Sequence, residues 1–120
     1  MKKSVILVDS DPESALMAQQ QLQINYDVTV ARSCAEALSL LSIQRPACLV
    51  FDVDLQGTSG TIMYSRVRRT PFLRDIPAVV YTNAGSRPVH FGLHTPVVSK
   101  ETDRFALRNA VDAVICRQSF

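Results

Sequence analysis

Short apolar segments alternate with segments of helical spacing along most of the chain. Residues 4–8 and 47–51 are almost entirely apolar, which is typical of strands covered on both faces. Residues 26–31, 76–81 and 96–99 carry the β-branched content of further strands. We therefore predict five strands, each followed by a polar segment.

The segments between these strands carry helix signals. Asp11, Pro12 and Glu13 form a typical helix start, with a carboxylate cap, a proline in the first turn and an acid behind it. This first helix is expected to run to about residue 24. Ser33 and Glu36 form a capping box that starts a second helix, expected to end near residue 46.

Two more helices are predicted further along. Residues 61–69 have helical apolar spacing, and residues 102–117 place one apolar stripe on a closing helix. The stripe consists of Ala106, Leu107, Ala110, Val111, Val114 and Ile115. Alternating strands and helices, with strands apolar on both faces, predict an α/β fold: a parallel sheet between helices, joined by right-handed crossovers. Residues 1–120 are expected to form one domain.

Composition narrows the class of protein. The chain has 120 residues, 47% hydrophobic, and a net charge of +2, too small to indicate nucleic acid or membrane as a partner. No apolar run reaches membrane-spanning length, and the first run meets acid too early for a signal peptide. Cys34, Cys48 and Cys116 have no paired spacing, so all three are interpreted as buried small hydrophobic residues in a reducing cytoplasm.

A polar residue of a particular kind follows each of four predicted strands. Asp9, Asp52, Thr82 and Lys100 come directly after the apolar runs, so a parallel sheet would gather them at its carboxyl edge, where such sheets bind ligands. Paired carboxylates hold Mg²⁺, and one of them can attack phosphorus. An amine and a hydroxyl can then bind phosphoryl oxygens. Each residue alone has an ordinary structural explanation; their joint placement favours a site.

The stretch "LVFDVDLQGTSG", beside "ILVDSDPE", "IPAVVYT" and "VVSK", resembles the receiver domains of response regulators in two-component signalling. This resemblance implies a flavodoxin-like, doubly wound sheet of order 2-1-3-4-5. It also implies that Asp52 is the phosphoacceptor, Thr82 the switch hydroxyl and Lys100 the cation that pairs with phosphate. The domain would be a phosphoacceptor rather than an enzyme, with at most slow self-phosphorylation and autodephosphorylation.

The same resemblance implies a cofactor and partners. Mg²⁺ would be held by Asp9, Ser10, Asp52 and the backbone carbonyl of Asp54. The phosphoryl donor would be a sensor histidine kinase or a phosphotransfer protein. The output would be a downstream effector protein or a fused output domain, with no direct contact to nucleic acid or membrane. The kinase, the effector and the oligomeric state are not specified by the sequence.

Ser10 stands where the family usually has a second acid. Losing a unit charge about 4 Å from a cation forfeits about 1–4 kcal/mol per cation charge. Because each 1.4 kcal/mol is about tenfold in affinity, Mg²⁺ binding is expected to weaken by a decade or more. Asp11 and Asp54 could compensate only if their side chains reach the pocket.

Other positions depart from the family pattern. Asn83 replaces a small residue, Val97 an aromatic switch residue and Glu101 a proline. Residues 83–96 are short and interrupted by glycine and proline, so we expect a shortened or irregular fourth helix. His90 and His94 have the spacing of a metal pair without an evident third ligand and are better explained as surface or packing residues.

Two alternatives therefore stay open. The chain could be a degenerate (pseudo-)receiver, a protein-interaction module that works without phosphorylation. An FMN-binding flavodoxin-like protein is disfavoured, because the loop after the first strand is acidic rather than rich in Gly, Ser or Thr.

A basic region is also present, comprising Arg66, Arg68, Arg69, Arg74 and Arg87. It is most simply a solvated face, with docking to an acidic partner as the second interpretation.

Overall fold

A five-stranded parallel sheet forms the centre of the computed structural model, which describes residues 2–55, 58–83, 95–101 and 105–118. The strand order is β2-β1-β3-β6-β7, which confirms the predicted order 2-1-3-4-5. The strands are β1 (Lys3–Val8), β2 (Tyr26–Ala31), β3 (Cys48–Phe51), β6 (Ala78–Thr82) and β7 (Val97–Ser99). All four pairs of neighbouring strands are parallel, so every strand ends at the same edge.

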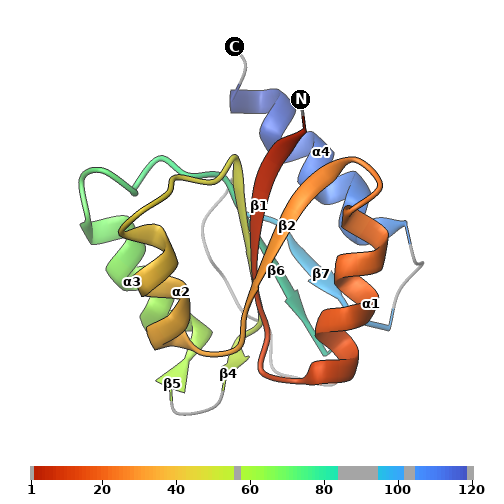
Figure 1. Ribbon diagram of the computed structural model, residues 1–120, viewed down its shortest axis with the longest axis horizontal. Helices are drawn as coiled ribbons and strands as arrows, with labels where there is room; N and C mark the ends of the chain where they lie inside the picture. The colour runs from red at the N-terminus through yellow and green to blue at the C-terminus, as the bar shows by residue number, and fades with distance from the viewer. Residues whose placement is uncertain (1, 56–57, 84–94, 102–104, 119–120) are drawn as a thin grey trace.

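Helices cover both faces of this sheet (Figure 1). On one face lie α1 (Pro12–Leu22) and α4 (Ala106–Gln118), and on the other α2 (Cys34–Leu41) and α3 (Gly60–Arg69). Two very short strands, β4 (Asp54–Leu55) and β5 (Thr58–Ser59), pair antiparallel in the connection between β3 and α3. In the part of the chain that the structure describes, no helix is long and apolar enough to cross a membrane.

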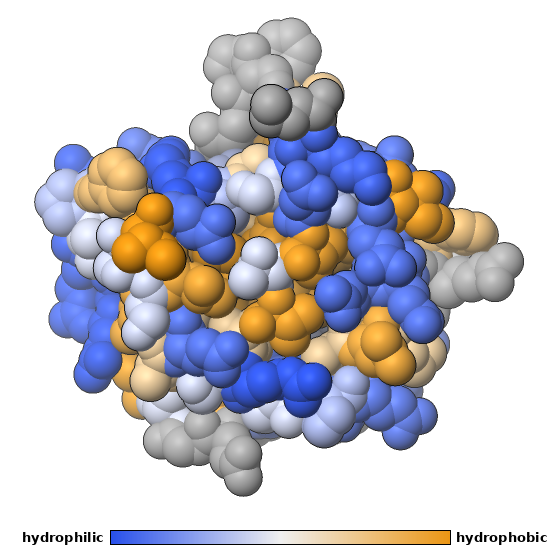
Figure 2. Space-filling view, viewed as in Figure 1, coloured by the Kyte–Doolittle hydropathy of each residue, from blue (hydrophilic) through white to orange (hydrophobic). Residues whose placement is uncertain are grey.

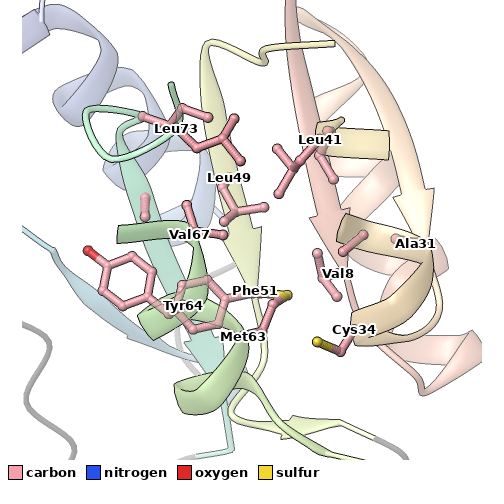
Figure 3. Close-up of a cluster of buried hydrophobic side chains, with 14 of the residues drawn as sticks. Val8, Ala31, Cys34, Leu41, Leu49, Phe51, Met63, Tyr64, Val67 and Leu73 are labelled. Carbon is pink, nitrogen blue, oxygen red and sulfur yellow. The ribbon is translucent and has the colours of Figure 1, made fainter. Parts of the chain in front are cut away.

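The apolar strands are buried on both faces because alternate side chains enter two separate cores. Val8, Leu49 and Phe51 pack with residues of α2 and α3 (Figure 3). Val5 and Leu7 pack instead with residues of α1 and α4. Burying each large apolar side chain stabilises the fold by about 1.5–3 kcal/mol. The two cores hold the strand ends, and therefore the residues that follow them, in fixed positions.

Both predicted helix starts are present. Asp11 Oδ1 accepts a hydrogen bond from the amide of Glu13 at 3.3 Å. Ser33 Oγ accepts one from the amide of Glu36 at 3.1 Å. The end of the first helix was predicted closely, since α1 stops at Leu22 and the expected end was residue 24.

The prediction that the second helix ends near residue 46 was wrong, since α2 ends at Leu41. The amides of Ile43 and Gln44 close a turn on Leu40, and the amide of Ala47 already bonds to Ser4 as the chain enters the sheet. The bond from Ala47 to Ser4 of β1 thus brings the chain into the sheet, and the helix ends before residue 46.

The last helix, α4, begins at Ala106, and the carbonyl of Phe105 accepts from the amide of Asn109 at 2.9 Å. Its apolar stripe is present, with Leu107, Val111 and Val114 buried. The prediction that all three cysteines are buried was wrong for Cys116, which is exposed on this helix, whereas Cys34 and Cys48 are buried. Residues 102–104 lie outside the described residues. So do residues 84–94, and with them most of the predicted irregular fourth helix, both histidines and Arg87.

Candidate functional site at the carboxyl edge of the sheet

Four polar side chains meet where the strands end. Asp9 follows β1, Asp52 follows β3, Thr82 ends β6 and Lys100 follows β7. The Lys100 ammonium lies between the two carboxylates, with Nζ 2.5 Å from Asp52 Oδ2 and 2.9 Å from Asp9 Oδ2. Thr82 Oγ1 donates a hydrogen bond to Asp52 Oδ1 at 2.9 Å. One carboxylate, Asp52, therefore contacts both a hydroxyl and an ammonium.

These groups are almost completely removed from solvent. Asp9 is 1% exposed, Asp52 6% and Thr82 5%. Burial lowers the pKa of the Lys100 ammonium, but its hydrogen bonds to Asp52 and Asp9 raise that pKa more, so it lies above the usual range of lysine. Two carboxylates against one ammonium leave the cluster with a net negative charge. A buried cluster of that sign attracts a further cation or an electrophilic group.

Backbone and hydroxyl donors fill the remaining carboxylate positions. Asp9 Oδ1 accepts from the amide of Asp11 at 3.0 Å, and Asp9 Oδ2 from Ser14 Oγ at 2.7 Å. Asp52 Oδ1 also accepts from the amide of Asp54 at 3.2 Å. Both oxygens of each acid thus have a protein donor. Ser14 was not predicted as part of this site; the available signal was a hydroxyl in the first turn of α1, the helix that begins soon after Asp9.

Gly60 determines how closely α3 approaches the end of β3. A Cβ atom at Gly60 would lie 2.0 Å from the backbone carbonyl oxygen of Asp52 and 3.0 Å from the ring of Phe51. The Gly60 amide donates to the carbonyl of Val53 at 2.7 Å, and Ser59 caps α3 through the amide of Ile62. Only glycine fits here without moving either the helix or Asp52. Gly60 could not be predicted from the sequence, because its contact with Asp52 arises only when α3 packs against β3.

The strand before Lys100 fixes where its side chain begins. The Lys100 amide donates to the carbonyl of Thr82 at 2.7 Å, so the ends of β6 and β7 are linked through the backbone. The Glu101 amide donates to Ser99 Oγ at 3.1 Å. Glu101 in the usual proline position therefore leaves Lys100 within reach of both acids. The Lys100 ammonium also lies 5.8 Å from the centroid of the Tyr81 ring.

The positions that depart from the family pattern lie around this cluster. Ser10 is partly buried, whereas Asn83 is exposed. Val97 is 45% exposed, with no aromatic group at that position. Asp11 and Asp54 are also exposed, and Asp11 caps α1, so neither side chain adds a buried charge.

The donor chemistry fits a hard cation. Asp9 and Asp52 are buried carboxylates, and Mg²⁺ is commonly held by one or two carboxylates together with waters and substrate phosphates. Within the described residues, no group of three or more His, Cys, Asp or Glu side chains could hold a metal. The residues present therefore fit Mg²⁺ through two carboxylates, with less charge than a three-acid site.

Comparison with known proteins identifies the family. The sequence profile of the response regulator receiver domain matches residues 5–112. The chain belongs to this family. Receiver domains are signalling domains rather than classical enzymes, interact in general with histidine kinases and effectors, and generally use Mg²⁺ in phosphorylation.

Individual relatives resemble the chain in sequence or in fold. An uncharacterized 14.6 kDa protein in the sodA1 3' region of Leptolyngbya boryana is 35% identical over 79 residues, 65% of this chain. The match spans 60% of that relative's length. The signal receiver domain of a signal transduction histidine kinase from Syntrophus aciditrophicus has a TM-score of 0.85 at 22% identity, covering 96% of this chain and 91% of its own.

The chemotaxis response regulator CheY4 of Vibrio cholerae is similar in the same way. Its TM-score is 0.81 at 19% identity, with 95% of this chain and 99% of the other covered. At these identities the two solved structures support the fold alone.

Proposed function

We propose that this receiver accepts a phosphoryl group on Asp52 from a sensor histidine kinase or a phosphotransfer protein and thereby switches a protein-interaction surface. One observation carries the proposal: Asp52 is buried, and its two oxygens contact the Thr82 hydroxyl and the Lys100 ammonium. These are the groups that bind phosphoryl oxygens well, one as a hydrogen-bond donor and the other as a charge-assisted donor.

In the proposed step a carboxylate oxygen of Asp52 attacks phosphorus. A new P–O bond forms as the bond from phosphorus to the leaving group breaks, and the leaving group takes that electron pair; the product is an acyl phosphate. Lys100 then pairs with one phosphoryl oxygen, and Thr82 donates its hydroxyl proton in a hydrogen bond to another. Asp9 keeps Lys100 at the acceptor through the 2.9 Å contact.

Mg²⁺, when bound, would neutralise phosphoryl charge, which is the chemistry that receiver domains generally require. Oxygens of Asp9 and Asp52, the Ser10 hydroxyl and the Asp54 carbonyl would hold it. We propose that its affinity is reduced because Ser10 supplies an oxygen without a charge.

The same contacts support a switch. In the unmodified site the Thr82 hydroxyl is held by Asp52, and the Thr82 carbonyl is held by the Lys100 amide. A phosphoryl oxygen on Asp52 would offer a new partner to the Thr82 hydroxyl and to the Lys100 ammonium. Because the backbone links these two residues, the ends of β6 and β7 would move together. Phosphorylation would thus bias an existing equilibrium between two surfaces.

A degenerate receiver is the second candidate. Two features favour it: protein groups already donate hydrogen bonds to the carboxylates of Asp9 and Asp52, and position 10 is a serine. In that case the four side chains would act as a buried polar network that rigidifies the carboxyl edge, and a partner would recognise the surface in one fixed state.

Intact mass after incubation with acetyl phosphate and Mg²⁺ distinguishes these candidates. A single phosphate adduct in the wild type that is absent in Asp52→Asn is the expected result. No adduct in the wild type, but one in Ser10→Asp, would show that the missing acid disables the site and would favour the degenerate receiver. An adduct that persists in Asp52→Asn would overturn the assignment of the acceptor.

A further inference from the structure

Two loops lie together at the opposite edge of the molecule, where the strands begin. One follows α2 and the other follows α3, and Figure 1 shows both at the top of the view. Arg45 joins them, because its Nη1 donates to the backbone carbonyl of Phe72 at 2.7 Å. Residues far apart in the sequence therefore form one continuous surface.

Each loop carries a large apolar side chain that faces solvent. Ile43 is 81% exposed and Phe72 is 64% exposed. Figure 2 shows apolar side chains among hydrophilic ones over the region where α2 and α3 end. One exposed apolar residue needs no explanation. Here two exposed apolar side chains lie on adjoining loops that an arginine joins. Phenylalanine and arginine are both enriched in protein interfaces.

Arginines lie on the same two loops and at the end of α3. Arg45, Arg69 and Arg74 are exposed, and Asp75 is the one acid in residues 42–47 and 70–77. Cations at helix ends complement the helix dipole, and Arg69 fits that explanation through its bond to the carbonyl of Ser65. Arg74 lies beyond the end of α3, so the helix dipole does not explain it. Its guanidinium also has no hydrogen-bond or ion-pair partner among the described residues.

Two clefts adjoin the loops on either side of Pro77, each of about 430 Å³. Arg45 and Lys3 line one of them, beside the apolar Ile115. Arg74 and Arg117 outnumber the one acid, Asp75, in the lining of the other, beside the apolar Val114. Each cleft thus combines positive charge with an apolar wall, and the exposed Ile43 and Phe72 stand on the loops that border them.

The loop after α3 is held rigidly. Leu73 and Ile76 are buried in the core, and the amides of Leu73 and Arg74 both bond to the carbonyl of Thr70. The Nη1 atom of Arg68, on the last turn of α3, donates to the carbonyls of Arg74 and Ile76. A surface that is already ordered loses little entropy when a partner binds.

Arg68 is in turn fixed by Tyr64. Its guanidinium lies 4.5 Å from the centroid of the Tyr64 ring, and its Nε donates to the Tyr64 hydroxyl at 2.7 Å. Tyr64 stacks on Phe51. Arg68 therefore belongs to the support of the loop, while Arg45 and Arg74 belong to its outer face.

We propose that the amino-edge surface, formed by Ile43, Arg45, Phe72 and Arg74 with the two clefts, docks an acidic segment of a partner protein that carries apolar side chains. The exposed cations select negative charge, and the apolar tips require a hydrophobic contact that a free anion cannot supply. The surface lies at the far end of β6 from Thr82, so the inference does not depend on phosphorylation of Asp52.

The test uses two synthetic 15-residue peptides with the same five leucine and phenylalanine residues, one rich in glutamate and the other in lysine. Binding to the full chain is followed by amide chemical shifts and by calorimetry. We expect the glutamate peptide to shift resonances of residues 42–47 and 70–77. Phe72→Ser with Arg74→Glu should weaken binding at least tenfold, since each substitution removes one of the two required contacts.

Matched controls locate the effect. Met17→Ser with Arg32→Glu makes the same chemical changes at exposed positions elsewhere, and binding should change by less than about twofold. Equal binding of both peptides, binding that survives the Phe72 and Arg74 changes, or shifts confined to α1 would overturn the proposal. So would tighter binding of the surface to vesicles of phosphatidylserine, or to pyrophosphate alone, than to the glutamate peptide.

Discussion

The two edges of the central sheet both carry charged side chains, yet they use them in opposite ways. At the carboxyl edge, Asp9, Asp52 and Lys100 are buried and satisfy one another. At the amino edge, Lys2 and Arg45 are exposed and donate to backbone carbonyls, those of Gln23 and Phe72. Burial decides the difference: charges removed from water must be paired with each other, and that pairing positions reactive groups.

The polarity of the fold explains which sign collects at which edge. Each helix after a strand starts at the carboxyl edge and ends at the amino edge, so helix N-termini gather at one edge and C-termini at the other. Acids are favourable at N-termini and cations at C-termini. Asp11 and Glu13 at the start of α1 follow this rule, as do Arg68 and Arg69 at the end of α3. The buried cluster departs from it, because Lys100 lies among acids.

The largest effect should come from removing the buried cation. Lys100→Met leaves Asp9 and Asp52 buried without their shared partner, and breaking a buried pair in this way costs about 3–5 kcal/mol. Arg45→Met at the amino edge is the matched change and should cost about 1 kcal/mol or less, since that side chain is exposed. Urea unfolding of both variants measures the contrast; equal losses would refute the distinction between the edges.

The next effect concerns the close contact of α3 with the end of β3. Gly60→Ala places a Cβ atom against the carbonyl of Asp52 and should lower the free energy of unfolding by about 1–3 kcal/mol. It should also shift the amide resonances of residues 52–54. Thr61→Ala, at the neighbouring exposed position, is the control and should change stability by about 0.5 kcal/mol or less. A Gly60→Ala protein of wild-type stability would contradict the packing argument.

A smaller loss is expected from the hydroxyl that holds Asp9. Ser14→Ala removes the 2.7 Å bond to Asp9 Oδ2 and should cost about 0.5–1.5 kcal/mol, the usual net contribution of one hydrogen bond, because Ser14 is only partly buried. Ser14→Thr keeps a hydroxyl and should retain most of the stability. Chemical denaturation of the pair checks this, and identical stability of the alanine and threonine variants would show that the bond contributes nothing.

The smallest effect should appear only in alkali. The folded protein raises the pKa of Lys100, so folding favours its protonated form. The resulting stabilisation is complete below the ordinary lysine value of 10.5 and is lost as pH rises through the higher folded value. As pH rises above 10.5, the wild type should therefore lose the part of its advantage over Lys100→Met that comes from this pKa shift, as unfolding curves at several pH values would show. A constant difference would mean that the ammonium is not the stabilising form.

The sequence by itself determined the order of elements and the residues at the strand ends. Apolar runs were sufficient for the five strands, and local hydrogen-bonding chemistry at Asp11 and Ser33 was sufficient for two helix starts. Since parallel strands end at one edge, residues as distant as Asp9 and Lys100 could be expected to meet. These features are readable because each depends on neighbouring residues or on a simple symmetry of the sheet.

Only the tertiary structure decided the contacts that cross between elements. The bond from Ser14 to Asp9, the fit of Gly60 against Asp52 and the joining of two loops by Arg45 have no local pattern. The early end of α2 belongs to the same class, because pairing of Ala47 with Ser4 outweighs the local tendency to continue the helix. Side-chain packing depends on the distances between elements, and those distances are set by all the buried side chains together rather than by any one segment.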